Sequence, residues 1–198
     1  MEVMKEYWSQ RYYKGRTGWD IGYPAPALTE YLDQLADKSL RILIPGAGNA
    51  YEAEYAWRQG FRDVHVLDIA PEPLAALAQR LPYFPREQLI EGDFFEHVGA
   101  YDLILEQTFF CSFPPLPETR RAYARQMHDL LVPGGKLVGL WFDIPLTGDM
   151  EKRPFGGTRA EYLAYLEPYF KVKVLERATN SIKPRAGSEL FGIFQRPE

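Results

Sequence analysis

The sequence predicts an α/β fold: a single domain with a seven-stranded, mostly parallel sheet, an antiparallel last strand and helices on both faces. Three observations predict it. Short apolar runs alternate with helical patterns along most of the chain. One such run leads through a glycine-rich turn into a helix, and two late strands are placed to pair with each other. The 198 residues suffice for one domain with a sizeable core.

The chain begins with a predicted helix whose aromatic residues share one face. Met4, Trp8 and Tyr12 recur at i, i+4 and i+8, and the Gly-rich segment GRTG ends the helix. Such a stripe is typical of core packing as well as of a ligand pocket. Trp19 differs, because it lies in a Gly- and Pro-rich loop where a large ring needs a pocket or a ligand to cover it. A second helix is expected at 27–35.

The central unit of the chain is LRILIPGAGNAYEAEYAWRQGFRDVHVLD, residues 40–68. A buried strand at 41–44 leads into the turn PGAGN, a helix follows from Ala50 to Gln59, and a second strand at 64–68 ends on Asp68. Glycines let a ligand approach the backbone, the helix N-terminus offers free N–H groups, and the acid can accept hydrogen bonds from a ribose diol. This layout is typical of a nucleotide site, although an ordinary tight turn can mimic it.

The remaining elements follow from the same periodicities. The helical spacing of apolar residues predicts three further helices, at 71–81, 117–131 and 158–166. Apolar runs predict five further strands, at 88–93, 101–106, 136–142, 171–177 and 189–195. A Pro-Gly-Gly turn leads into the strand at 136–142. The loop between the last two strands allows them to pair in antiparallel orientation.

Composition limits the classes of partner. The net charge of −4 and the pI near 5.5 give no basic footprint for nucleic acid or for an anionic membrane. The N-terminus lacks the apolar core of a signal peptide, and no run approaches the roughly 18 apolar residues of a membrane span. A single cysteine excludes an internal disulfide framework. We therefore expect a cytoplasmic protein with neither a nucleic-acid nor a membrane partner, and the scattered histidines predict no metal site.

Dinucleotide dehydrogenases and class I methyltransferases share the central unit, and the chain as a whole separates them. A nicotinamide-dependent oxidoreductase generally needs a second domain, for which 198 residues leave no room, and the third glycine of its pattern is absent where Ala50 and Tyr51 stand. A class I methyltransferase needs one seven-stranded sheet with ligand at the carboxyl ends of the central strands. The sequence favours the methyltransferase. A cofactor-binding protein without transferase activity stays an alternative.

Six segments are together similar to one known family. In order, over about residues 7–145, they are WSQRYYKGRTGWDIGYPAP, LIPGAGNAYEA, VLDIA, EGDFFE, YDLILEQTFFC and LLVPGGKLVGLWF, with SELFGIFQR as a weaker echo near the end. They resemble the thiopurine S-methyltransferase superfamily, and specifically its thiol and halide methyltransferase branch. The resemblance implies a Rossmann-like class I methyltransferase fold and S-adenosylmethionine as the methyl donor.

The resemblance also implies N-terminal residues that close over the cofactor. Trp8, Tyr12 and Trp19 match the aromatic residues of the family that do so. Residues 1–36 are therefore expected to form a helical cap or lid over the cofactor site. Tyr12 stands where the halide enzymes usually carry tryptophan.

Further positions match the cofactor contacts of the family in the loops after the strands. Gly46 matches the glycine beneath the methionine part of the cofactor, and Asp68 matches the ribose acid. Asp93 and Phe94 match the pair beside the adenine. Gln107 matches a contact after the fourth strand, although the halide enzymes usually carry tyrosine there.

Two further positions bear on the match to the family. Glu106 is a weaker candidate for a cofactor contact. Ala50 replaces a glycine, which is tolerated if that position is already helical. The departures from the family pattern preserve the expected cofactor site and count against halide activity.

The implied chemistry asks little of side chains. Methyl transfer to a thiol or sulfide, with halides and thiopurines as alternatives, is an in-line displacement that depends on a dry, aligned pocket more than on an acid or base. No covalently catalytic residue is expected: Cys111 is interpreted as a buried thiol and His128 as a helix surface or packing residue. Four aromatic residues belong either to an acceptor pocket or to the core: Phe109, Phe110, Trp141 and Phe142.

Overall fold

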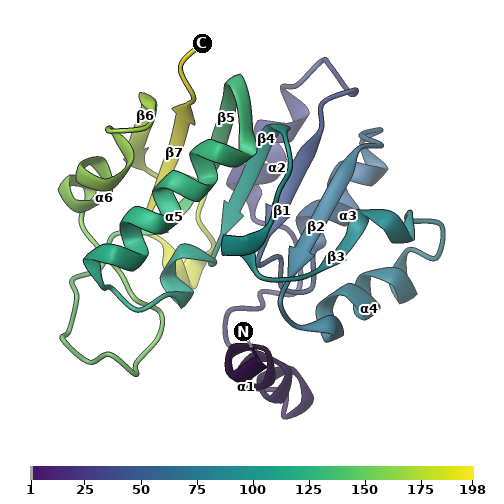
Figure 1. The fold of residues 1–198 in the computed structure, drawn as a ribbon, viewed down its shortest axis with the longest axis horizontal. Helices are drawn as coiled ribbons and strands as arrows, with labels where there is room; N and C mark the ends of the chain where they lie inside the picture. Colours follow the sequence, from purple (N-terminus) through teal and green to yellow (C-terminus); the bar gives the residue numbers. More distant parts are fainter. Residues whose placement is uncertain (1) are drawn as a thin grey trace.

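The computed structural model describes residues 2–198, and its strands form one mixed sheet (Figure 1). The strands are β1 (Ile42–Pro45), β2 (Val64–Asp68), β3 (Leu89–Glu91), β4 (Tyr101–Gln107), β5 (Leu131–Phe142), β6 (Lys171–Arg177) and β7 (Glu189–Gln195). Their order is β3-β2-β1-β4-β5-β7-β6. Strands β1 to β5 pair in parallel, and β7 runs antiparallel to both β5 and β6. The predicted seven-stranded sheet with an antiparallel last strand is confirmed.

The helices lie close to their predicted positions. They are α1 (Glu2–Tyr13), α2 (Pro26–Asp33), α3 (Tyr51–Arg58), α4 (Pro71–Arg80), α5 (Pro117–Leu130) and α6 (Arg159–Leu166). Four short 3-10 turns that the sequence did not predict are η1 (Arg86–Gln88), η2 (Phe94–Glu96), η3 (Phe110–Ser112) and η4 (Lys183–Arg185). None of the helices described here is long and apolar enough to cross a bilayer.

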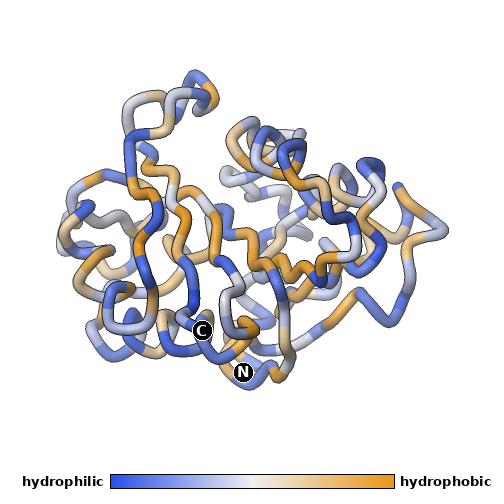
Figure 2. The backbone as a smooth tube through the Cα atoms, turned by 90° about the horizontal axis from the view of Figure 1, so that it is seen from above, coloured by the Kyte–Doolittle hydropathy of each residue, from blue (hydrophilic) through white to orange (hydrophobic). Residues whose placement is uncertain are grey.

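Helices cover both faces of the sheet because consecutive strand residues point to opposite sides. In β1, Ile42 and Ile44 belong to the apolar cluster that contains residues of α2, α3 and α4, whereas Leu43 belongs to the cluster with residues of α5 and α6. Figure 2 shows the most hydrophobic stretches gathered in the central strands. Strands buried on both faces have no polar side, which is why the sequence shows them as continuous apolar runs.

The fifth strand begins earlier than the sequence predicts. The Pro-Gly-Gly turn was expected to precede a strand at 136–142, but β5 already pairs Leu131 with Tyr101. The register then shifts before Lys136 pairs with Leu103, and Gly134 has a φ of +76° in between. The Pro-Gly-Gly residues therefore form a bulge within a longer strand, because β5 pairs with β4 both before and after them.

The first two helices differ in how they attach to the body. Leu28 and Leu32 of α2 are fully buried in the core, whereas α1 contributes no buried residue. Figure 1 shows α1 beyond the strand ends, outside both helix layers. An ion pair from Lys5 to Glu91 and a 2.8 Å hydrogen bond from Ser9 to Glu72 link α1 to β3 and α4. Helix α1 therefore lies over the loops that follow the parallel strands.

Candidate active site

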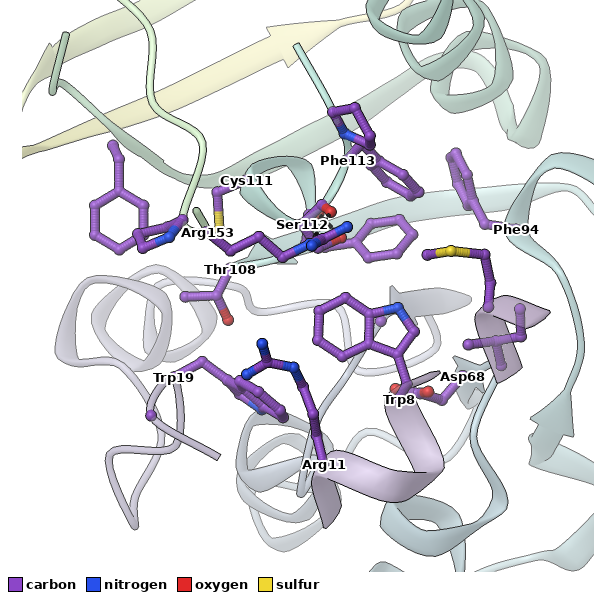
Figure 3. Close-up of a pocket in the computed structure, with 18 of the residues that line it drawn as sticks. Trp8, Arg11, Trp19, Asp68, Phe94, Thr108, Cys111, Ser112, Phe113 and Arg153 are labelled. Atoms are coloured by element: carbon purple, nitrogen blue, oxygen red, sulfur yellow. Dashed lines mark hydrogen bonds between the residues drawn. The ribbon is translucent and has the colours of Figure 1, made fainter. Parts of the chain in front are cut away.

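A cavity of about 670 Å³ lies at the carboxyl ends of the parallel strands. Small-molecule sites typically measure about 300–1,000 Å³. Helix α1, the loops after β1 to β5 and the β6–β7 loop form its walls (Figure 3). Strand β1 lies between β2 and β4 in the sheet, and an α/β sheet binds its ligands at such a reversal of strand order.

The glycine-rich loop after β1 forms the floor of the cavity. Gly46 has a φ of +56°, and a Cβ atom at this position would lie 1.9 Å from the Cδ2 atom of Phe109. Glycine is therefore required at 46 both by the left-handed backbone and by the aromatic ring that packs on it. The amide of Gly46 donates a 2.7 Å hydrogen bond to the carbonyl of Leu67, which joins the loops after β1 and β2.

Ala50 is not helical, which corrects the expectation that the helix begins there. The structure places it as the N-cap of α3, one residue before the helix, with a φ of +55°. Alanine in the left-handed conformation costs about 1–2 kcal/mol. Its replacement of the family glycine is therefore accommodated at a cost in backbone strain.

Asp68, at the end of β2, is a buried acid on the cavity wall. It is 7% exposed, and its carboxylate accepts a 2.9 Å hydrogen bond from the amide of Ala70. Burial raises the pKa of Asp68 to about 7, while hydrogen bonds from the amides of Ala70 and Gly48 oppose the shift. The carboxyl therefore fixes the turn after β2 beside the glycine-rich loop.

Asp93 and Phe94 follow β3 and also line the cavity. The Asp93 carboxylate caps η2 by accepting a 2.9 Å hydrogen bond from the amide of Phe95. Phe94 is buried, and its ring meets the ring of Phe109 edge to face at 5.1 Å between centroids. These contacts hold the side chains of Asp93 and Phe94 in place on the cavity wall.

Three aromatic residues of the N-terminal segment pack on one another at the cavity. Trp19 meets Trp8 at 5.4 Å and Tyr12 at 5.5 Å between ring centroids, in both cases edge to face. The loop that carries Trp19 is fixed independently, because Asp20 accepts a hydrogen bond from Asn49 and the carbonyl of Trp19 accepts a 2.9 Å hydrogen bond from Arg185. Trp19 is thus covered by side chains of α1, as its position in a loop required.

Glu106 shapes the turn after β4 from beneath the cavity. Its carboxylate is 1% exposed and accepts hydrogen bonds from the amides of Phe109 (2.9 Å) and Phe110 (3.1 Å) and from the hydroxyl of Tyr123. Burial raises its pKa to about 7. Between strand and turn, Thr108 lines the cavity with a φ of +54°, a conformation that a β-branched residue rarely adopts.

Seven of the eight expected cofactor residues line this one cavity: Trp8, Tyr12, Trp19, Gly46, Asp68, Asp93 and Phe94. Gln107 does not. It lies beside Ala25 and Asn180 at a separate small void, and its Oε1 atom is buried without a hydrogen-bond partner among residues 2–198. Glu106 is likewise absent from the lining of the cavity.

The four aromatic residues with open assignments divide evenly. Phe109 and Phe142 line the cavity, whereas Phe110 and Trp141 are buried in the core. Cys111 lines the cavity and is 8% exposed, and burial raises the pKa of its thiol. His128 packs beside Tyr169 and lies outside the lining.

Sequence reasoning missed the arginines of the cavity wall, which are Arg11, Arg153 and Arg185. Arg11 follows Trp8 by three residues, so helical spacing could have placed it on the same face. Arg153 and Arg185 come from loops, where the sequence carries no periodic signal. In the part of the chain described here, no cluster of three or more His, Cys, Asp or Glu side chains is arranged to hold a metal ion.

Comparison with known proteins shows the family of this chain. The model of the thiopurine S-methyltransferase family matches residues 3–198. The chain belongs to this family. It is accordingly a methyltransferase that depends on S-adenosylmethionine, with a small-molecule methyl acceptor implied.

Relatives of this thiopurine S-methyltransferase family member include two plant proteins. A probable thiol methyltransferase 2 from Arabidopsis thaliana is 29% identical over 196 residues, which cover 96% of this chain and 84% of the relative. A thiocyanate methyltransferase 1 from Brassica oleracea is 29% identical over 195 residues, with the same coverage of 96% and 84%. The matches extend over nearly the whole chain.

A solved structure shares the fold of this family member. The Burkholderia thailandensis 1,6-didemethyltoxoflavin-N1-methyltransferase, bound to 1,6-didemethyltoxoflavin and S-adenosylhomocysteine, superposes with a TM-score of 0.75 at 22% identity. The match covers 100% of this chain and 88% of that one. The predicted class I methyltransferase fold is confirmed.

The two buried carboxyls predict how the stability of the ligand-free protein depends on pH. Because the folded pKa values of Asp68 and Glu106 are raised to about 7 from 3.8 and 4.5, the native state keeps protons that the unfolded chain releases in between. Stability therefore falls as pH rises from about 4 to 7. Asp68→Asn removes one titrating group. The free energy of unfolding of this variant should therefore increase relative to that of the wild type as pH rises from about 4 to 7, by on the order of 2–4 kcal/mol.

Urea denaturation at several pH values from 4 to 7.5 measures this difference. Glu106→Gln should show the same trend at the second carboxyl. If the unfolding free energies of the wild type and the variants change in parallel with pH, Asp68 and Glu106 are not buried, protonated carboxyls.

Proposed function

We propose that this methyltransferase transfers its methyl group to a small soft nucleophile, a thiol or sulfide, by in-line displacement. The lining of the cavity is the observation that carries the proposal. Aromatic and aliphatic side chains form most of it, and no histidine is present among the lining residues in the described part of the chain. An apolar wall suits a soft anion that needs alignment and loss of water more than it needs a general base. The names of the thiol and thiocyanate methyltransferase relatives support this class of acceptor.

We infer that the seven cavity residues hold S-adenosylmethionine, and their chemistry fits that group. The buried Asp68 offers carboxylate oxygens to a ribose diol, and the bare backbone at Gly46 allows close approach. Asp93 and Phe94 offer an acid and a ring for the adenine. Gln107 stays in the proposed set only through the family resemblance, because it lies outside the cavity lining.

Aromatic rings supply the remaining requirement, which is an environment for a cation. When bound, S-adenosylmethionine supplies an electrophilic methyl group on a positively charged sulfur. The faces of Trp8, Tyr12 and Trp19 can each favour such a charge by about 0.5–2 kcal/mol. Because these rings also exclude water, they leave the acceptor anion poorly solvated and more reactive.

We further propose that the cap expected at residues 1–36 is limited to its first part, and that α1 is the segment that moves. Helix α1 buries no residue and is linked to the body through polar contacts and the rings at Trp8 and Tyr12. Helix α2, in contrast, is part of the core. A segment with few buried apolar contacts opens at low free-energy cost. Closure of α1 would exclude water from the reacting groups.

The acceptor assignment is tested by measuring methylated product from small thiols, sulfide, iodide, thiopurines and oxygen nucleophiles. A small thiol or sulfide should be the preferred acceptor. In the absence of a general base, kcat/KM for a thiol should rise with pH toward the pKa of the thiol itself, about 8.5 for a cysteine-like group. Iodide is the control, because it needs no deprotonation: any rate with iodide should be nearly flat over the same range. Preference for an oxygen acceptor over every thiol would refute the proposal.

The ribose assignment is tested by Asp68→Ala. Loss of a carboxylate that accepts two hydroxyl groups should raise the Kd for S-adenosylhomocysteine about 30- to 1,000-fold, which corresponds to roughly 2–4 kcal/mol. Isothermal titration calorimetry measures the Kd, and circular dichroism checks that the variant is folded. Asp68→Asn preserves the shape and should be affected less.

Glu118→Ala, at an exposed acid in the first turn of α5, is the matched control and should leave the Kd unchanged. A folded Asp68→Ala variant with the affinity of the wild type would show that Asp68 does not bind the ribose.

A further inference from the structure

The cavity carries positive charge that the proposed reaction does not use. We propose that Arg11 and Arg153 bind a second, permanently anionic group of the acceptor, so that the preferred substrates are thiols that also carry a carboxylate. This inference rests on the proposed thiol methylation and specifies the class of thiol.

Arg11 is placed on the cavity face of α1 without a partner for its charge. It follows Trp8 by three residues and lines the cavity beside it. Its Nε atom is buried and has no hydrogen-bond partner among residues 2–198, and its guanidinium carbon lies 5.0 Å from the ring centroid of Tyr7. A buried N–H donor without a hydrogen-bond partner is costly, and a bound anion would accept that hydrogen bond and balance the charge of the half-buried guanidinium.

Arg153 reaches the same space from the segment between β5 and α6. Its Nε donates a 2.8 Å hydrogen bond to the carbonyl of Ser112, and its Nη1 donates a 3.1 Å hydrogen bond to the hydroxyl of Tyr7. The guanidinium also stacks at 4.9 Å from the ring centroid of Tyr7 and at 5.6 Å from that of Trp8. These contacts fix the plane of the guanidinium and leave its Nη2 donors without a protein partner among the described residues. Figure 3 shows Arg11 and Arg153 extending into the space beside Trp8.

The charge of these two arginines is not balanced within the cavity. In residues 2–198, neither guanidinium forms an ion pair with a carboxylate. The third arginine is balanced, because Arg185 lies 3.6 Å from the carboxylate of Glu189 and donates to the carbonyl of Trp19. The acids of the cavity wall are engaged by backbone amides. Two cations in one apolar cavity therefore favour a ligand that brings its own negative charge.

The geometry of guanidinium groups favours an oxyanion as that ligand group. A planar fork of N–H donors matches the two oxygens of a carboxylate, which a spherical anion does not offer. The carboxylate could belong either to the acceptor or to the methionine part of the cofactor. These two assignments differ in which affinity each arginine controls, and this difference decides between them.

The test compares two small thiols that differ in charge. Mercaptoacetate carries a carboxylate and 2-mercaptoethanol a hydroxyl group, and kcat/KM for each is measured at saturating S-adenosylmethionine and one pH. Arg11→Met and Arg153→Met should each lower the ratio of kcat/KM for mercaptoacetate to that for 2-mercaptoethanol about 10- to 100-fold, because a charge-assisted pair inside the cavity is lost. The difference between the pKa values of the two thiols affects the ratio equally in every variant, so it cancels when the ratio of a variant is compared with that of the wild type.

Controls separate charge from packing and acceptor from cofactor. Arg11→Lys and Arg153→Lys keep the charge and should retain part of the preference, whereas Arg121→Met, an exposed position on α5, should retain all of it. The Kd for S-adenosylhomocysteine should change less than about threefold in every variant.

Two results would overturn the inference while leaving the proposed function intact. The first is methylation of both thiols with a ratio that no arginine variant changes. The second is an equal loss with both thiols accompanied by weaker binding of S-adenosylhomocysteine, which would assign the arginines to the carboxylate of the cofactor. If the wild type methylates neither thiol, the inference fails, and the proposed function fails with it only if sulfide and the other small thiols are not methylated either.

Discussion

The site depends on one constraint, which is that parallel strands end at a common edge that their own helices do not cover. Crossover helices pack on the faces of a parallel sheet, so the carboxyl ends of the strands are left to loops. The loop after β1 supplies Gly46, the end of β2 supplies Asp68, and the turn after β4 supplies Thr108. Any cover over this edge has to come from outside the alternating pattern, and α1 is the segment that lies there.

Two buried carboxyls hold the edge in shape. Asp68 accepts a hydrogen bond from the amide of Ala70 in its own turn, and Glu106 accepts hydrogen bonds from the amides of Phe109 and Phe110. Phe109 in turn packs on Gly46, so the loops after β1 and β4 fit against each other. Because both carboxyls are desolvated, their pKa values are raised. The cavity floor is therefore held by groups whose burial itself costs free energy, a pattern typical of functional sites.

The sequence predicted the fold and the central unit from Gly46 to Asp68 through periodicity, whereas most of the other cavity residues were expected from the family resemblance. Periodicity places Asp68 at the end of a strand, and the common edge then brings it near Asp93, whose strand lies alongside. The resemblance placed Gln107 in the site, but the structure puts it outside the cavity lining, and alternation along β4 does not say which of its last residues faces the cavity. Sequence reasoning also missed the bulge in β5, since a Pro-Gly-Gly segment signals a turn whether or not strand pairing continues beyond it. Arg153 comes from a long loop, whose path only the folded chain determines.

In the proposed function the N-terminal helix is the closing element of the site, and hydrogen exchange tests this most directly. Helix α1 buries no residue, whereas the loop that carries Trp19 is held by Asn49 and Arg185. Exchange of the amides of 2–13 should be fast in the free protein and should slow markedly when S-adenosylhomocysteine is bound, while the amides of α2 stay protected in both states. Identical exchange of α1 with and without the ligand, measured under saturating binding, would contradict the account and would make Trp8 and Tyr12 residues of a fixed wall.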